Sequence, residues 1–86
     1  MKQPVTIIHI IKLLEDGEFR GAYFDKKRNR FIYESSWYNV VKFYAMTKDN
    51  AEIECAYQTI NNGLDCVVES VVIEDSLGPC AYKCNG

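Results

Sequence analysis

Hydrophobic residues near the amino end of the chain are clustered and do not alternate with polar ones. At 100° per residue they cover somewhat more than half of a helical circumference, and they are Ile7, Ile8, Ile10, Ile11, Leu13 and Leu14. His9, Lys12 and Asp16 fall on the remaining side. Thr6 suits a helix N-cap, and Gly17 suits the residue that follows a helix. The pattern predicts an amphipathic helix over Thr6–Gly17, which is stable only if another layer covers it.

The next two segments predict a β-hairpin. Apolar and aromatic residues in Glu18–Asp25 are typical of a strand, and Arg30–Glu34 has the composition of its partner. Between them lies the polar sequence Lys26-Lys27-Arg28-Asn29, which we interpret as the turn. A second helix is predicted over about Trp37–Met46, with Ser35 or Ser36 as its N-cap.

Strict alternation returns in the carboxyl-terminal half. Glu52–Ile60 places Ile53, Cys55 and Tyr57 on one side, which predicts a half-buried strand. Asn62-Gly63 is a strong signal for a two-residue hairpin turn. Asp65–Glu74 is rich in valine and is interpreted as the partner strand. The residues after Asp75 show no periodicity.

These elements predict an α+β fold, in which a four-stranded antiparallel sheet carries two helices on one face in a two-layer sandwich. The expected order is α-β-β-α-β-β. Residues 1–75 would form one domain, followed by an irregular tail at 76–86. The main alternative has Val5–Leu14 as a buried strand, which would give a five-stranded sheet with one helix.

Composition is consistent with a single globular domain. The chain has 86 residues, of which 48% are hydrophobic and 26% charged. No apolar run reaches the roughly 18 residues that a membrane span needs. The apolar stretch near the amino end lacks a small-x-small cleavage site, so we expect a cytoplasmic protein that does not associate with membranes.

Charge is distributed unevenly along the sequence. Residues 1–48 contain nine Lys or Arg against five Asp or Glu, whereas residues 49–86 contain one against seven. Such an asymmetry is typical of a protein with a charged partner, although a compact fold can bring the two halves together and partly cancel it.

The four cysteines do not form a recognisable metal motif. Cys55, Cys66, Cys80 and Cys84 contain no C-x-x-C pair. We expect reduced thiols, with Cys55 and Cys66 packed as small hydrophobic residues, and disulfides or a metal site as alternatives. The single histidine, His9, is expected at the surface. No phosphate-binding loop, zinc or calcium motif or nucleophile signature is present, so neither a cofactor nor an enzymatic activity is expected.

The predicted hairpin turn is the first candidate binding site. Lys26, Lys27, Arg28 and Arg30 place four cations within five residues, and aromatic residues flank them. Such a tip can hold phosphates while bases stack on the rings, or it can contact an acidic protein. A solvated turn is the alternative, since charged residues are common in any hairpin turn.

Acidic and aromatic residues form the second candidate. The acids expected on the carboxyl-terminal hairpin are Glu52, Glu54, Asp65 and Glu69, and they could face a basic partner. Tyr38 and Tyr82 are candidate contact residues, because tyrosine is favoured in interfaces. Tyrosines at the edge of the core are the alternative interpretation.

The favoured function is therefore a small non-enzymatic protein-binding module, which could inhibit a nucleic-acid-processing enzyme in the manner of small phage-encoded anti-defence proteins. The alternative is a nucleic-acid-binding accessory domain that uses the basic hairpin. An enzyme or small-molecule sensor is a third class, since a pocket can form without a sequence signature. A homodimer through an open sheet edge also remains open.

Overall fold

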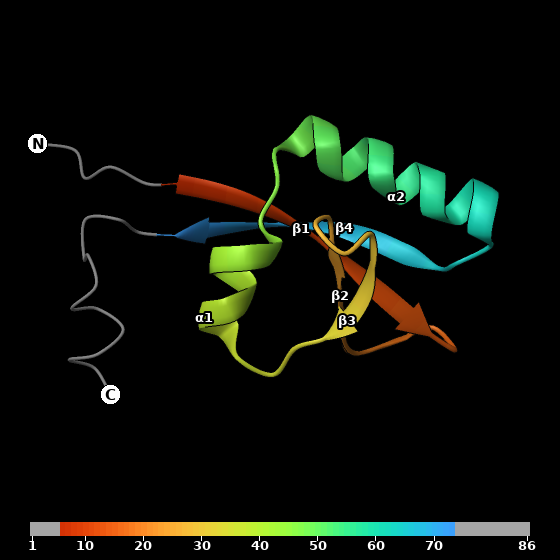
Figure 1. Ribbon diagram of the computed structural model, residues 1–86, viewed down its shortest axis with the longest axis horizontal. Helices are drawn as coiled ribbons and strands as arrows, with labels where there is room; N and C mark the ends of the chain where they lie inside the picture. Colours follow the sequence, from red (N-terminus) through yellow and green to blue (C-terminus); the bar gives the residue numbers. More distant parts are fainter. Residues whose placement is uncertain (1–5, 74–86) are drawn as a thin grey trace, which may run out of the picture.

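The computed structural model of the protein describes residues 6–73 (Figure 1). The elements in chain order are β1 (Thr6–Glu15), β2 (Glu18–Asp25), β3 (Arg30–Tyr33), α1 (Trp37–Asn39), η1 (Val40–Tyr44), α2 (Lys48–Asn62) and β4 (Cys66–Ile73). The strands form one antiparallel sheet in the order β3-β2-β1-β4. The α+β class with a four-stranded antiparallel sheet is therefore confirmed, but the predicted element order is wrong.

The predicted helix over Thr6–Gly17 is instead strand β1, at the centre of the sheet. Ile8 and Ile10 are buried on one face of the sheet, and Ile11 is buried on the other. A strand covered on both faces has a nearly continuous hydrophobic sequence, which explains why alternation is missing. The alternative of a strand over Val5–Leu14 was correct for this segment, although the sheet has four strands and not five.

Gly17 does not end a helix but forms a hairpin turn. Asp16 and Gly17 both have positive φ angles, 56° and 79°, and they join β1 to β2. This is the conformation that Asp-Gly favours in two-residue hairpin loops. The next hairpin is confirmed, since β2 has the predicted bounds, β3 pairs with it, and residues 26–29 form the turn.

The second predicted helix is also confirmed, as α1 continued by the π-helical segment η1, although it ends at Tyr44 and not at Met46. Ser36 is its N-cap, and the Ser36 hydroxyl oxygen accepts from the Asn39 amide. The chain then crosses the edge of β1 that β2 leaves uncovered, where His9 and Met46 exchange two backbone hydrogen bonds. This crossing carries the chain from one face of the sheet to the other.

The predicted strand Glu52–Ile60 is wrong, because these residues belong to helix α2. Thr47 caps its start by accepting from the Asn50 amide at 3.2 Å. Gly63 ends it in the left-handed region, with a φ of 67°. Asn62-Gly63 is thus the end of a helix and not a hairpin turn. The strand predicted over Asp65–Glu74 is confirmed as β4.

The two helical segments cover opposite faces of the sheet (Figure 1). The prediction that both helices lie on one face is therefore also wrong. The η1-side core contains Ile8, Ile10, Tyr23, Val40 and Tyr44. The α2-side core contains Ile11, Phe24, Ala51 and Cys66. Residues directly opposite in the register share a face, and this assignment holds across all four strands.

Within residues 6–73, no helix has the length and apolar character needed to cross a bilayer. The boundary proposed at residues 75 and 76, the predicted tail, Tyr82, Cys80 and Cys84 all lie outside the described residues.

Candidate functional site

The β2–β3 turn is built around a buried carboxylate. Asp25 is 6% exposed, and its Oδ1 accepts from the amides of Lys27 at 3.0 Å and Arg28 at 3.4 Å. The Arg28 guanidinium lies 3.5 Å from Asp25 Oδ2, and Asn29 closes the turn with a φ of 59°. Asparagine tolerates this left-handed conformation better than most residues. The result is a fixed turn whose cations stand in solvent.

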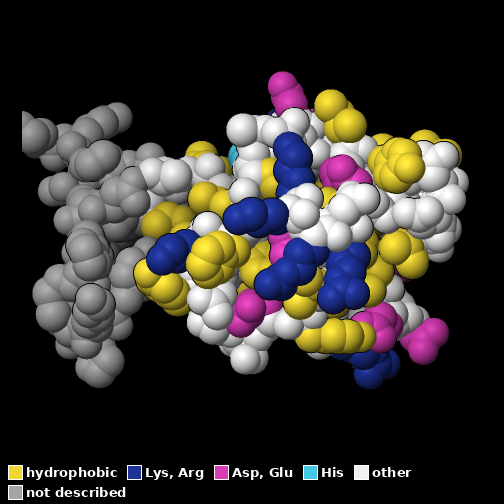
Figure 2. Space-filling view, in the orientation of Figure 1, with side chains coloured by type: hydrophobic (Ala, Val, Ile, Leu, Met, Phe, Trp, Pro, Cys, Tyr) yellow, Lys and Arg dark blue, Asp and Glu magenta, His cyan; other side chains and the backbone are white. Residues whose placement is uncertain are grey.

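All four predicted cations of this turn are exposed at one end of the hairpin, namely Lys26, Lys27, Arg28 and Arg30. Figure 2 shows Lys and Arg side chains gathered at the centre of the face in view, with hydrophobic groups on either side. Of the three aromatic residues expected beside the turn, Tyr23 is buried and Phe31 packs against the α2-side core, whereas Tyr33 is 64% exposed and its hydroxyl donates to Glu15.

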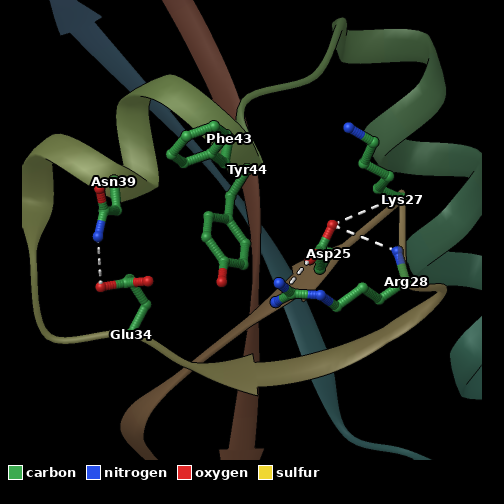
Figure 3. A pocket seen from close by; sticks show the side chains of 7 residues that line it. All are labelled: Asp25, Lys27, Arg28, Glu34, Asn39, Phe43 and Tyr44. Carbon is green, nitrogen blue, oxygen red and sulfur yellow. Dashed lines mark hydrogen bonds and ion pairs between the residues drawn. The ribbon is translucent and has the colours of Figure 1, made fainter.

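A cleft of about 330 Å³ lies between this turn and η1. Figure 3 shows the side chains that line it: Asp25, Lys27, Arg28, Glu34, Asn39, Phe43 and Tyr44. Glu34 is held by the Asn39 amide group and the Ser36 backbone amide, each at 3.1 Å. Burial raises the pKa of the Tyr44 hydroxyl, and the carboxylates of Glu34 and Asp25 raise it further. The cleft is lined by equal numbers of acidic and basic side chains.

Exposed aromatic rings come from the α1–η1 segment. Tyr38 and Phe43 are each 61% exposed, and the Lys42 ammonium lies 5.5 Å from both ring centroids. Trp37, Tyr38, Val41 and Lys42 line a second hollow of about 560 Å³. Tyr38 was predicted as a contact residue and is placed at the surface. Phe43 also belongs to the predicted second helix, and the wider turn of the π-helix directs it outward while Val40 and Tyr44 remain buried.

Helix α2 presents a second apolar surface, which the sequence analysis missed. Ile53, Tyr57 and Ile60 are 68%, 53% and 78% exposed and lie on the side of α2 opposite Ala51 and Gln58, which are buried. We call Ile53, Tyr57 and Ile60 the α2 stripe. Their i, i+4, i+7 spacing is visible in the sequence, but Ile53 and Tyr57 were interpreted with the period of a strand.

The four predicted acidic contact residues are not brought together as one face. Glu52 and Glu54 flank Ile53 on the two sides of α2, and Asp65 is exposed in the α2–β4 loop. Glu69 is directly opposite Ile10 and shares its face of the sheet, which is the η1 side and not the α2 side. There the Glu69 carboxylate pairs with the Lys12 ammonium at 2.9 Å. The first three acids make no ion pair with another described residue, although Glu54 accepts from the Gln58 amide group.

Cys55 and Cys66 are free thiols that join α2 to β4. Their sulfur atoms are 3.4 Å apart, and each thiol is also within hydrogen-bonding distance of the other residue's carbonyl oxygen. Their proximity depends on Cys55 lying in helix α2, which packs against β4. The pKa of the Cys55 thiol is raised from about 9.0 to about 11. Desolvation is the largest cause, and the contact with Cys66 is the next.

His9 pairs with Ser70 across the β1–β4 register, with Nδ1 and the serine hydroxyl oxygen 2.7 Å apart. No described carboxylate bonds to the imidazole, so the orienting third group of a nucleophilic triad is missing from this part of the chain. Residues 6–73 also contain no group of three or more His, Cys, Asp or Glu side chains arranged to hold a metal ion.

The arrangement thus leaves two separate exposed surfaces as candidates for binding: the α2 stripe with its flanking acids, and the basic turn with the exposed rings of α1–η1. Comparison of the chain with protein-family models, with curated proteins and with solved structures gave no match.

Proposed function

We propose that the protein is a non-enzymatic binding module that docks α2 into an apolar groove with a basic rim on another protein. Helix α2 and strand β4 stand in place of the predicted carboxyl-terminal hairpin, so Glu52 and Glu54 are presented by a helix. The main support of the proposal is the α2 stripe, whose three large side chains are more than half exposed on one side of one helix.

The spacing of the stripe suits a helix-in-groove interface. Such interfaces are typically anchored by residues at i, i+3 or i+4, and i+7, which is the pattern of Ile53, Tyr57 and Ile60. Burying an aliphatic or aromatic side chain contributes roughly 1.5–3 kcal/mol. Three such anchors supply about 4.5–9 kcal/mol, which is comparable to the roughly 4–15 kcal/mol cost of association, so a specific complex also needs the acids that flank the stripe.

Charge favours a basic partner over a second copy of this chain. Asp49, Glu52 and Glu54 lie along the amino-terminal half of α2, and Lys48 is the only cation of this helix. Two α2 helices packed together therefore have few cations to offset these acids, whereas a basic rim complements them. Proteins that bind nucleic acid present such basic grooves. If α2 occupied the groove of such a protein, this domain would act as its inhibitor. We place the interaction in the cytoplasm, where the free thiols of Cys55 and Cys66 stay reduced.

Affinity capture from the source cells with matched variants tests this function. The wild type is expected to retain a protein that Ile53→Ser/Ile60→Ser loses and that Glu52→Gln/Glu54→Gln retains only weakly at physiological salt. The control Val72→Ser removes an exposed hydrophobic residue of β4 and should leave capture unchanged. With the purified partner, calorimetry should show at least about 10-fold weaker binding for the stripe variant.

Two results would contradict the proposal. One is a captured set of proteins that is identical for the wild type and for the stripe variant. The other is a solution mass twice the 9.9 kDa of the chain that falls to the monomer value in Ile53→Ser/Ile60→Ser, because the stripe would then be a homodimer interface.

A further inference from the structure

Cations and exposed rings meet on a second surface that α2 does not share. It consists of Lys26, Lys27 and Arg30 at the β2–β3 turn together with Tyr38, Lys42 and Phe43 of α1–η1, and we call it the basic aromatic surface. We propose that this surface binds single-stranded nucleic acid, with phosphates at the cations and bases stacked on the rings. The inference goes beyond the proposed protein docking and does not depend on it.

The two parts of this surface are continuous. The cleft between the turn and η1 has Lys27 on one side and Phe43 on the other, as Figure 3 shows. Beyond Phe43, the Lys42 ammonium lies 5.5 Å from the rings of both Phe43 and Tyr38. A single nucleic-acid strand that runs from the turn across η1 therefore meets a cation and then a ring, which is the arrangement found in grooves that bind single-stranded nucleic acid.

The local charge is positive although the chain carries a net charge of −2. Lys26, Lys27, Arg30 and Lys42 form no ion pair with any described residue. The acids nearby are already engaged, because Asp25 accepts from the turn amides and pairs with Arg28. Glu34 likewise accepts from Asn39 and from the Ser36 amide. The free cations can therefore attract phosphates without first breaking internal pairs.

The exposed rings favour a single strand over a duplex. Tyr38 and Phe43 are 61% exposed, and the Lys42 ammonium lies over one face of each ring, so the opposite face is available to an unpaired base. Paired bases are stacked on one another and cannot reach a ring on a helix surface without being extruded. The cations alone would serve either form, and the rings therefore set the preference.

Fluorescence anisotropy with a labelled oligo-dT of about 12 nucleotides tests the phosphate contacts. At about 50 mM salt, Lys27→Gln/Arg30→Gln should bind at least about 10-fold more weakly than the wild type. The slope of log affinity against log salt should become shallower by about 1.4, the value for two lost contacts on a single strand. The matched control Arg20→Gln/Lys48→Gln removes the same charge elsewhere and should change the affinity by less than about 2-fold.

A second pair of variants tests the rings. Phe43→Ala should weaken binding by about 5-fold or more, whereas Phe43→Tyr should retain it, because stacking survives. Tyr57→Ala removes an exposed ring from the α2 stripe and should leave oligonucleotide binding unchanged. Since Tyr57 belongs to the protein-docking surface, this control separates failure of the present inference from failure of the proposed function.

Several results would overturn the inference: no saturable binding below about 100 µM at low salt, an equal loss in the charge control, or no effect of Phe43→Ala. Equal affinity for a duplex of the same length would exclude the single-strand preference. Tighter binding of a poly-glutamate peptide than of the oligonucleotide would assign the surface to an acidic protein instead.

Discussion

The helical segments that cover the two faces of the sheet differ in how many large apolar side chains they bury. The short segment Trp37–Tyr44 places Val40 and Tyr44 in the η1-side core. The 15-residue helix α2 supplies Ala51 as its one fully buried apolar residue, and its other buried residue is the polar Gln58. We therefore expect the longer helix to contribute less to folding than its length suggests, while its large apolar residues face solvent. Helix length does not measure how much a helix adds to the core, and residues that a helix does not bury are candidates for function.

The largest expected effects lie in the sheet itself, which both helical segments depend on. Phe24 and Ile10 are fully buried, one in each core. Phe24→Ala should lower the free energy of unfolding by about 3–5 kcal/mol and Ile10→Ala by about 2–5 kcal/mol, because each leaves a cavity. Urea denaturation followed by circular dichroism measures both. A loss under about 1 kcal/mol in either variant would mean that the face concerned is not closely packed.

The next prediction compares the two helical segments directly. Val40→Ala should cost about 1.5–3 kcal/mol, since the side chain is 1% exposed. Gln58→Ala should cost less than about 1 kcal/mol, because its bonds to Glu54 and Asn62 stay within α2 and both partners can reach water. The same urea titration gives both values, and the reverse order would show that α2 is the main support of the sheet.

The two N-caps sharpen the comparison further. Thr47→Ala at the start of α2 should cost about 1 kcal/mol. Ser36→Ala at the start of α1 should cost less, since it caps the short α1–η1 segment, whereas Thr47 caps the 15 residues of α2. Thermal unfolding of the two variants checks the order, and equal shifts would show that the length of the capped segment has no consequence.

The smallest effect concerns pH at the α2–β4 contact. The folded-state pKa of Cys55, about 11, lies above the usual 9.0, so the folded chain holds the thiol proton more tightly. The free energy of unfolding of the wild type should therefore fall, relative to Cys55→Ala, as pH rises from about 9 to 11. At pH 10 the difference should stay below about 1 kcal/mol, because the thiol is partly exposed. Parallel pH dependences of the two proteins would contradict it.

The sequence predicted the middle of the chain well. Both strands of the β2–β3 hairpin and the helix after it were correct, because a polar turn and a serine N-cap mark their limits locally. Two Gly-containing dipeptides were assigned the wrong way round: Asp16-Gly17 is a hairpin turn and Asn62-Gly63 ends a helix. A left-handed glycine serves both purposes, and only long-range pairing decides between them.

The candidate surfaces likewise divide into features that the local sequence predicts and features that depend on long-range pairing. The exposed cations of the β2–β3 turn follow from the local sequence. The contact of Cys55 with Cys66, the pairing of Glu69 with Lys12 and the outward position of Phe43 depend on register, on the choice of face and on a π-helix. None of these has a sequence signature, and the α2 stripe was hidden because Ile53 and Tyr57 also fit a strand period.

The most direct test of the account is the stability of Ile53→Ser/Ile60→Ser. If the α2 stripe serves docking and not folding, urea denaturation should give a free energy of unfolding within about 1 kcal/mol of the wild type, since both side chains are more than two-thirds exposed. A loss above about 2 kcal/mol would contradict the account, because it would show that these residues are part of the core.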